Sequence, residues 1–218
     1  MTDVRGLARR ERDEFADLLA GLSAPQWDAP SLCARWTVRA VAAHTVAYLG
    51  QSLTRLVTNM IRARGDVDRL NARALPAYDV IEHTALVDLM RCDAEPSGAA
   101  GLYGGRVALI ECLIHQQDIR RPLGIHRTIP DEPIIVSLDY ARISPVIGGA
   151  RRTRGVRLVA TDLDWSAGSG PEVHGPGEAL LLAMTGRISA VRDELEGDGL
   201  VRLRRACRGG EDPAEFSP

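Results

Sequence analysis

Apolar residues recur every three or four positions through much of the chain, which is the spacing of amphipathic helices. In the first segment Leu7, Phe15 and Leu18 share one side of a helix, and Arg and Glu residues occupy the other. The pattern resumes after Thr37, a good N-cap, and continues to Gly65, a typical helix end. The sequence therefore predicts helices over residues 2–22 and 38–65.

The same spacing predicts three more helices further along the chain. One precedes the Glu-Pro-Ser-Gly sequence at residues 95–98, and the next is ended by Pro122 and Gly124. The last carries Pro133 in its first turn, where proline is tolerated. These helices are expected over residues 79–93, 103–121 and 131–143.

The pattern changes after Pro145. VRLVATD and DWSAGSGPEVHG alternate and turn like short strands, GPGEALLLAMTGR reads as a helix, and GDGLVRLRRAC as a last short element. The fold class is therefore mainly α, a helical bundle followed by a small α/β domain. We expect the bundle over 1–146, a linker over 147–155, the small domain over 156–208 and a disordered tail over 209–218.

The composition of the 218-residue chain is that of a folded globular protein. It is 45% hydrophobic and 26% charged with a formal net charge of -2, so a polyanion partner is not indicated. Aromatic residues make up 4% and no basic stripe interleaves with them, which argues against nucleic-acid binding. All basic residues are Arg and none is Lys, which suits bidentate contacts to carboxylates or phosphates, although surface charge is the simpler interpretation.

The cysteines and the apolar runs indicate a reducing compartment. No CxxC pair occurs, so neither a disulfide framework nor a structural zinc site is expected. No stretch approaches 18 apolar residues, and the N-terminus lacks the apolar core of a signal peptide. We expect a cytoplasmic protein without a membrane partner. The four thiols are those of Cys33, Cys92, Cys112 and Cys207.

The segment ECLIHQQD places three titratable groups on one side of a helix that is otherwise apolar. Glu111, His115 and Asp118 stand at i, i+4 and i+7, within about 60° of one another. A carboxylate buried there without a partner would cost several kcal/mol or take up a proton. An Arg partner or a metal ion would resolve this cost.

His44 stands in a second apolar run, AVAAHTVAYL. Two histidines and one glutamate from facing helices form a three-ligand set with open positions, as in catalytic zinc sites and some non-haem iron sites. A core histidine without metal is the alternative on spacing alone. A shared metal ion requires the donor atoms to converge to separations of about 3 to 3.5 Å. Asp118 would then hold a ligand imidazole, or remain a solvated charge near the helix end.

Three sequence blocks resemble the mycothiol-dependent maleylpyruvate isomerase family. They are ERDEFADLLAGLSAPQWDAPSLCARWTVRAVAAHTVAYL, then GGRVALIECLIHQQDIRRPLG, then GVRLVATDLDWSAGSGPEVHGPGEALLLAMTGR. Together they span most of residues 8–205, whereas residues 51–100 carry no motif of the family. The resemblance implies a DinB-like, metal-binding four-helix bundle followed by a small sterol-carrier-like α/β domain.

The resemblance also implies a set of site residues. His44, Glu111 and His115 match the family's ligands to a divalent metal, usually zinc, and mycothiol would be the thiol cosubstrate of a maleylpyruvate-like electrophile. Arg187 in MTGR is the best match to a catalytic arginine of the small domain. Arg120 and Arg121 are further candidates for binding the cofactor, and Asp118 is a candidate catalytic residue. We expect the two domains to share one cleft, with Arg187 facing the metal.

Two functions remain open at this point. One is a mycothiol-dependent isomerase or S-transferase acting on a small electrophile, with a small molecule and a low-molecular-weight thiol as partners. The other is a metal-containing ligand-binding protein of the same fold without turnover. In either case Cys112 is expected to pack as a small hydrophobe, Cys33 is not needed as a nucleophile, and His83, His126 and His174 are expected at the surface.

Overall fold

The structure, a computed structural model, describes residues 2–62, 64, 81–92 and 94–208. The chain divides into two compact units, Met1–Thr128 and Ile129–Pro218. Within the described residues, no helix is long and apolar enough to cross a membrane. The predicted tail, residues 209–218, lies outside the described residues.

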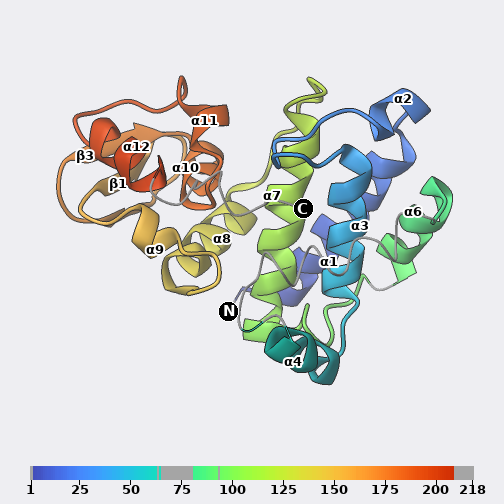
Figure 1. Cartoon of the computed structure of the whole chain (residues 1–218). Helices are drawn as coiled ribbons and strands as arrows, with labels where there is room; N and C mark the ends of the chain where they lie inside the picture. Colours follow the sequence, from blue (N-terminus) through green and yellow to red (C-terminus); the bar gives the residue numbers. More distant parts are fainter. Residues whose placement is uncertain (1, 63, 65–80, 93, 209–218) are drawn as a thin grey trace. The chain divides into compact units, whose positions relative to one another are not determined.

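The first unit is a four-helix bundle (Figure 1). Helix α1 packs on α6 and α7, and α3 packs on the same two helices, so the four enclose one core. A short helix, α2, connects α1 to α3, and a 3-10 turn, η2, precedes α7. The bounds are α1 Val4–Ala20, α2 Ala24–Trp27, α3 Val38–Leu49, α6 His83–Cys92, η2 Leu102–Gly105 and α7 Arg106–Arg120.

The helix starts follow local sequence signals. The Asp3 side chain accepts a hydrogen bond from Gly6 N at 2.9 Å, and the Thr37 side chain accepts one from Ala40 N at 3.2 Å. Both bonds satisfy backbone N–H groups that a helix start leaves without an internal partner. Tyr103 and Gly105 have φ angles of 53° and 92°, so the predicted helix 103–121 becomes regular only at Arg106.

The helix predicted over 38–65 is in fact two helices. Helix α3 ends at Leu49, and α4 (Leu53–Arg62) follows. The Gln51 carbonyl accepts a hydrogen bond from Ala99 N at 2.9 Å, and the Gln51 side chain accepts one from Asn59 at 3.0 Å. These tertiary bonds take the chain out of the helix after Gly50, which the apolar spacing could not reveal. The predicted end, Gly65, lies outside the described residues.

Helix α1 is less simply amphipathic than predicted, because it buries charged side chains. Glu11 receives a bidentate pair of bonds from Arg127, at 2.6 and 2.9 Å, and Arg12 donates from Nε to the Met90 carbonyl at 2.8 Å. Gln116 of α7 also donates to the Glu11 side chain, at 3.1 Å. A charge can be buried at acceptable cost when it is paired and hydrogen-bonded.

The second unit combines helices with a small sheet, as predicted. Strand β1 lies in the centre, antiparallel to β2 and parallel to β3, with Leu158 opposite Ala167 and Val173. Helix α10 follows β3 and packs on α8 and α11. The bounds are α8 Asp131–Ile143, α9 Gly149–Arg152, β1 Arg157–Ala160, β2 Ser166–Gly168, β3 Glu172–Gly175, α10 Gly177–Met184, α11 Ile188–Val191 and α12 Leu200–Arg208.

The division between the units falls after Thr128, whereas the sequence placed it after residue 146. Helix α8 belongs to the second unit because it packs on α10, and Asp139 accepts a hydrogen bond from Trp165 Nε1 at 3.0 Å. The segment expected as a linker, 147–155, contains α9. A helical pattern alone does not say which core receives the apolar face.

Candidate metal centre

The candidate ligands come from the two central helices of the bundle. His44 lies on α3, and Glu111 and His115 lie one turn apart on α7. Both histidines are buried, with exposed fractions of 5%, although imidazole is a polar group. Their burial beside a carboxylate means that each ring must satisfy its nitrogens within the protein.

The three side chains converge on one point. His115 Nε2 lies 3.2 Å from Glu111 Oε2, and His44 Nε2 lies 3.8 Å from the same oxygen. The ring centroids of the two histidines are 5.0 Å apart, and the three donor atoms lie within 4.8 Å of one another. The distance from His115 lies in the expected range of about 3 to 3.5 Å, and the distance from His44 is longer than that range.

The electrostatics of Glu111 depend on the histidines. Burial raises the pKa of its carboxyl group, but the hydrogen bonds and charges of His115 and His44 outweigh burial and bring the pKa well below its usual range. Glu111 is therefore ionised across the physiological range. An ionised carboxylate beside two imidazole nitrogens is the donor set that Zn²⁺ and related divalent ions bind.

Asp118 holds the other nitrogen of His115. His115 Nδ1 contacts Asp118 Oδ2 at 2.8 Å, and we assign Nδ1–H as the donor because the same oxygen also accepts from the Cys33 thiol. Asp118 is fully buried, so it is not the solvated charge that the alternative interpretation described. Burial lowers the pKa of His115, but the bonds from Asp118, Cys33 and Glu111 outweigh it and leave that pKa well above the usual value.

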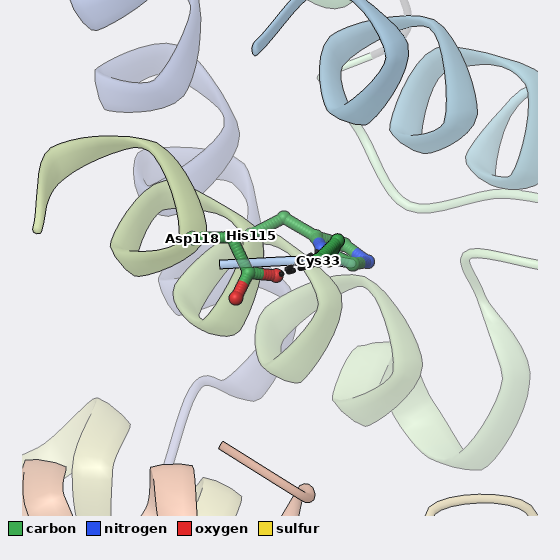
Figure 2. A group of neighbouring side chains, drawn as sticks. All are labelled: Cys33, His115 and Asp118. Atoms are coloured by element: carbon green, nitrogen blue, oxygen red, sulfur yellow. Dashed lines mark hydrogen bonds and ion pairs between the residues drawn. The ribbon is translucent and has the colours of Figure 1, made fainter. Parts of the chain in front are cut away.

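Cys33 is a site residue that the sequence interpretation left aside. Its thiol donates to Asp118 Oδ2 at 3.1 Å, on the same oxygen that His115 contacts (Figure 2). Cys33, His115 and Asp118 thus form a second group of donor atoms within 4.8 Å, and it shares His115 with the first. Because 85 positions separate Cys33 from Asp118, no local spacing could have indicated the contact.

Aromatic rings surround His44. The Trp36 ring centroid lies 5.1 Å from that of His44, and the Tyr48 centroid lies 6.0 Å away on the next turn of α3. Rings at these distances restrict the rotation of the imidazole and exclude water from one side of it. Trp36 was visible in the sequence as part of the resemblance, but its role beside His44 was not.

Arg120 and Arg121 end α7, and the structure does not bring Arg120 to the donor set. Its guanidinium group donates to Gln116 Oε1 at 3.3 and 3.2 Å, about 140° around the helix from His115. Gln116 in turn contacts Glu11 of α1, so the Arg120 side chain lies on the side of α7 that faces α1. Burial, together with the charge of Arg127, lowers the pKa of Arg120. Arg121 is half-buried at the C-cap.

Arg187 lies in the second unit, between α10 and α11. Its Nη1 donates to the Thr185 carbonyl at 2.7 Å, and its side chain is half-buried. This bond satisfies a carbonyl group at the end of α10 and therefore has a local structural use. The expectation that Arg187 faces the metal in a shared cleft stays a prediction.

The remaining histidines and cysteines have other surroundings. His83 stacks on Trp27, with ring centroids 4.4 Å apart, so it is less exposed than expected, and His174 is half-buried beside Glu172. His126 is exposed, as expected. Cys112 is fully buried, and burial raises the pKa of its thiol far above its usual value, which fits a packing role. Cys92 is exposed and Cys207 is buried.

The fold and the donor set define a class: a helical bundle that places two histidines and a glutamate at its centre, followed by a small α/β unit. Residues 8–101 match the family described as the mycothiol maleylpyruvate isomerase N-terminal domain. The family resemblance drawn from the sequence is thereby confirmed.

Solved structures with the same fold carry the resemblance along most of the chain. A crystal structure of mycothiol-dependent maleylpyruvate isomerase is 19% identical, with a TM-score of 0.60, over 91% of this chain and 93% of that one. A mutant of that enzyme gives 18% identity and a TM-score of 0.59 with the same coverage. The predicted fold class is confirmed. No match is found among curated proteins.

Proposed function

We propose that this protein is a metal-dependent enzyme that uses a low-molecular-weight thiol to isomerise a small electrophile, or that joins the thiol to such an electrophile. The observation that carries the proposal is the convergence of His44, Glu111 and His115 in the core of the bundle. Two imidazoles and a carboxylate leave coordination positions open, which is typical of catalytic rather than structural zinc sites. We therefore propose zinc as the metal, with these three residues as its ligands.

The donor set fits a divalent cation on the chemistry of its atoms. Glu111 supplies an ionised oxygen, and the Nε2 atoms of His44 and His115 point toward it. Asp118 holds the proton of His115 on Nδ1 and so leaves Nε2 available as a ligand. A metal ion bound there would favour the thiolate form of a cosubstrate and polarise a substrate oxygen.

We propose mycothiol as the thiol and a maleylpyruvate-like, cis-unsaturated acid as the electrophile. The support is the match of residues 8–101 to the mycothiol maleylpyruvate isomerase N-terminal domain and the shared fold. The exogenous thiol would add to the double bond, rotation would follow, and the thiol would leave. The protein's own task is then to bind and orient both molecules in a site shielded from water.

Arg187 is our proposed partner for a substrate carboxylate. A guanidinium group contacts a carboxylate through two parallel bonds, which an ammonium group cannot reproduce. Arg187→Lys is therefore expected to impair turnover while the second unit keeps its fold. Full activity in this variant would reduce Arg187 to its structural bond with the Thr185 carbonyl.

The test combines metal content with thiol chemistry. Elemental analysis of the purified protein is expected to find about one divalent metal ion per chain, and about none in Glu111→Gln, which keeps the side-chain shape but removes the charge. The metal-loaded protein is then mixed with mycothiol and a series of cis-unsaturated acids, and formation of the trans isomer or loss of free thiol is followed. Turnover by the wild type and its loss in Glu111→Gln support the proposal.

A binding protein without turnover gives a different result. Mycothiol would still raise the melting temperature of the metal-loaded protein, because a ligand stabilises the state it binds. No electrophile would be converted, however, and no free thiol would be consumed. That outcome rejects the catalytic proposal and keeps the metal site.

A further inference from the structure

We infer that Cys33 is a positioning residue for His115: its thiol fixes the Asp118 carboxylate, and Asp118 fixes the imidazole. This inference rests on the proposed metal site, in which His115 is a ligand, but it adds Cys33, which has no role in the proposed function. Its basis is a set of contacts between a short loop, residues 31–36, and helix α7.

The first step is the shared oxygen. Asp118 Oδ2 accepts from His115 Nδ1 at 2.8 Å and from Cys33 Sγ at 3.1 Å (Figure 2). Asp118 is fully buried, so it has no bulk water to hold its carboxylate in place. The thiol donates a second hydrogen bond to the same oxygen atom from a different direction. Two bonds to one oxygen restrict rotation of the carboxylate about its last torsion.

The second step is that the loop itself is fixed. The Leu32 N–H donates to the Asp118 carbonyl at 3.0 Å, so the backbone beside Cys33 is bonded to the residue that the thiol contacts. Ser31 Oγ accepts from Cys33 N at 3.1 Å and donates to the Trp36 carbonyl at 2.8 Å. These bonds place the thiol before any ligand binds.

The third step is the strain in this loop. Arg35 has a φ of 67°, a left-handed conformation that is uncommon for a residue other than glycine. The turn closes with a bond from Trp36 N to the Cys33 carbonyl at 3.0 Å. Non-glycine residues keep such a conformation where the surrounding structure imposes it, commonly at functional sites.

The consequence is that one loop supports both proposed histidine ligands. The Cys33 thiol contacts Asp118, which in turn contacts His115. Trp36 lies beside His44, with ring centroids 5.1 Å apart. The proposed role of Cys33 is therefore to keep the His115 ring oriented, with Nδ1 toward Asp118 and Nε2 toward Glu111. The group Cys33, His115 and Asp118 could also be considered as a second metal-binding set, and the experiment separates the two roles.

The first measurement is metal affinity by competition with a chelator. Cys33→Ala is expected to weaken Zn²⁺ binding by about 10-fold, because outer partners of a ligand histidine typically contribute that much. Cys33→Ser retains a donor and is expected to restore affinity to within about 3-fold of the wild type. Cys92→Ser, at an exposed thiol on α6, is the matched control and should leave affinity unchanged.

The second measurement does not depend on metal. In the metal-free protein labelled with ¹⁵N-histidine, NMR reports the proton on His115 Nδ1, with His115→Ala providing the assignment. This signal is expected to shift and broaden in Cys33→Ala, and to return in Cys33→Ser. A wild type that binds no metal would reject the metal proposal, while this signal would still test the positioning role.

Two outcomes overturn the inference. The first is a Cys33→Ala protein with wild-type metal affinity and an unchanged His115 signal, which would make the thiol a packing group. The second is a thiolate-to-metal absorption band in the Co²⁺-loaded wild type that disappears in Cys33→Ser. That band would show that Cys33 itself binds the metal ion. The metal site would then be formed by Cys33, His115 and Asp118.

Discussion

Two carboxylates on opposite sides of helix α7, the buried Glu11 and the partly buried Glu111, are neutralised in different ways. On the α1 side, Glu11 is bound by the guanidinium group of Arg127 through two bonds at 2.6 and 2.9 Å. On the α3 side, Glu111 has two imidazoles as its partners, at 3.2 and 3.8 Å. The first pair has a permanent cation, because arginine does not lose its proton in proteins.

The difference separates a structural charge pair from a candidate site. The Glu11–Arg127 pair is complete, and Gln116 adds a further bond to it. The negative charge of Glu111 is neutralised only while one of the two imidazoles carries an extra proton. A divalent cation can take the place of that proton. A carboxylate beside imidazoles can therefore exchange a proton of its partners for a metal ion, whereas a carboxylate paired with arginine cannot.

The largest expected effect comes from removing a proposed ligand. His115→Ala deletes one of three donors and leaves Glu111 with His44 alone, so stoichiometric metal binding should be lost. Elemental analysis after dialysis measures this directly, and circular dichroism should show unchanged helix content. A variant that keeps one metal ion per chain would show that His115 is not a ligand and that the comparison with Glu11 is misplaced.

On the opposite side of α7, removing the partner of Glu11 should lower the stability of the fold. Arg127→Met leaves Glu11 buried without its cation, which typically costs about 3–5 kcal/mol. Urea denaturation should show this loss in the free energy of unfolding, while the metal affinity of the folded protein should remain that of the wild type. A fall in metal affinity as large as the fall in stability would mean that the two carboxylates are coupled across the helix.

A smaller effect is expected from Asp118→Asn. The amide keeps the size of the side chain but presents no charge to His115 Nδ1, so metal binding should weaken by about 10- to 100-fold. Isothermal titration with Zn²⁺ measures the change. Asp88→Asn, on the exposed surface of α6, is a control for charge alone. Equal affinities in the Asp118 variant and the wild type would return Asp118 to a packing role.

The pH dependence sharpens the comparison further. The pKa of His115 lies well above its usual value, so the metal-free protein keeps this proton at neutral pH, and a binding metal ion must displace it. Metal affinity should therefore rise with pH, by up to about tenfold per unit for one displaced proton, in a range where an ordinary histidine is already neutral. Asp118→Asn weakens the hydrogen bond that favours the protonated imidazole and that raises the pKa of His115, so the rise should move to lower pH. Titrations at several pH values follow both curves, and an affinity independent of pH above the usual histidine range would contradict the raised pKa.

The sequence by itself determined the helices, their caps and the juxtaposition of Glu111, His115 and Asp118. These features are local: the turn of an α-helix brings residues i, i+4 and i+7 together, and Thr37 caps its helix through a residue three positions away. His44 was already a candidate from its position in a second apolar run, and the similarity of three sequence blocks then matched it to the same set. Helix spacing alone could not say that α3 faces α7.

Only the tertiary structure decided where the helices end and which groups surround the proposed ligands. The break after Gly50 follows from a bond between Gln51 and Ala99, and α8 belongs to the second unit because its partner α10 lies beyond the sheet in sequence. The burial of Glu11 depends on Arg127, 116 residues away, and Cys33 reaches Asp118 across 85 residues. A period of 3.6 residues contains no information about such distant partners, because each contact depends on how separate elements pack once their apolar faces are buried.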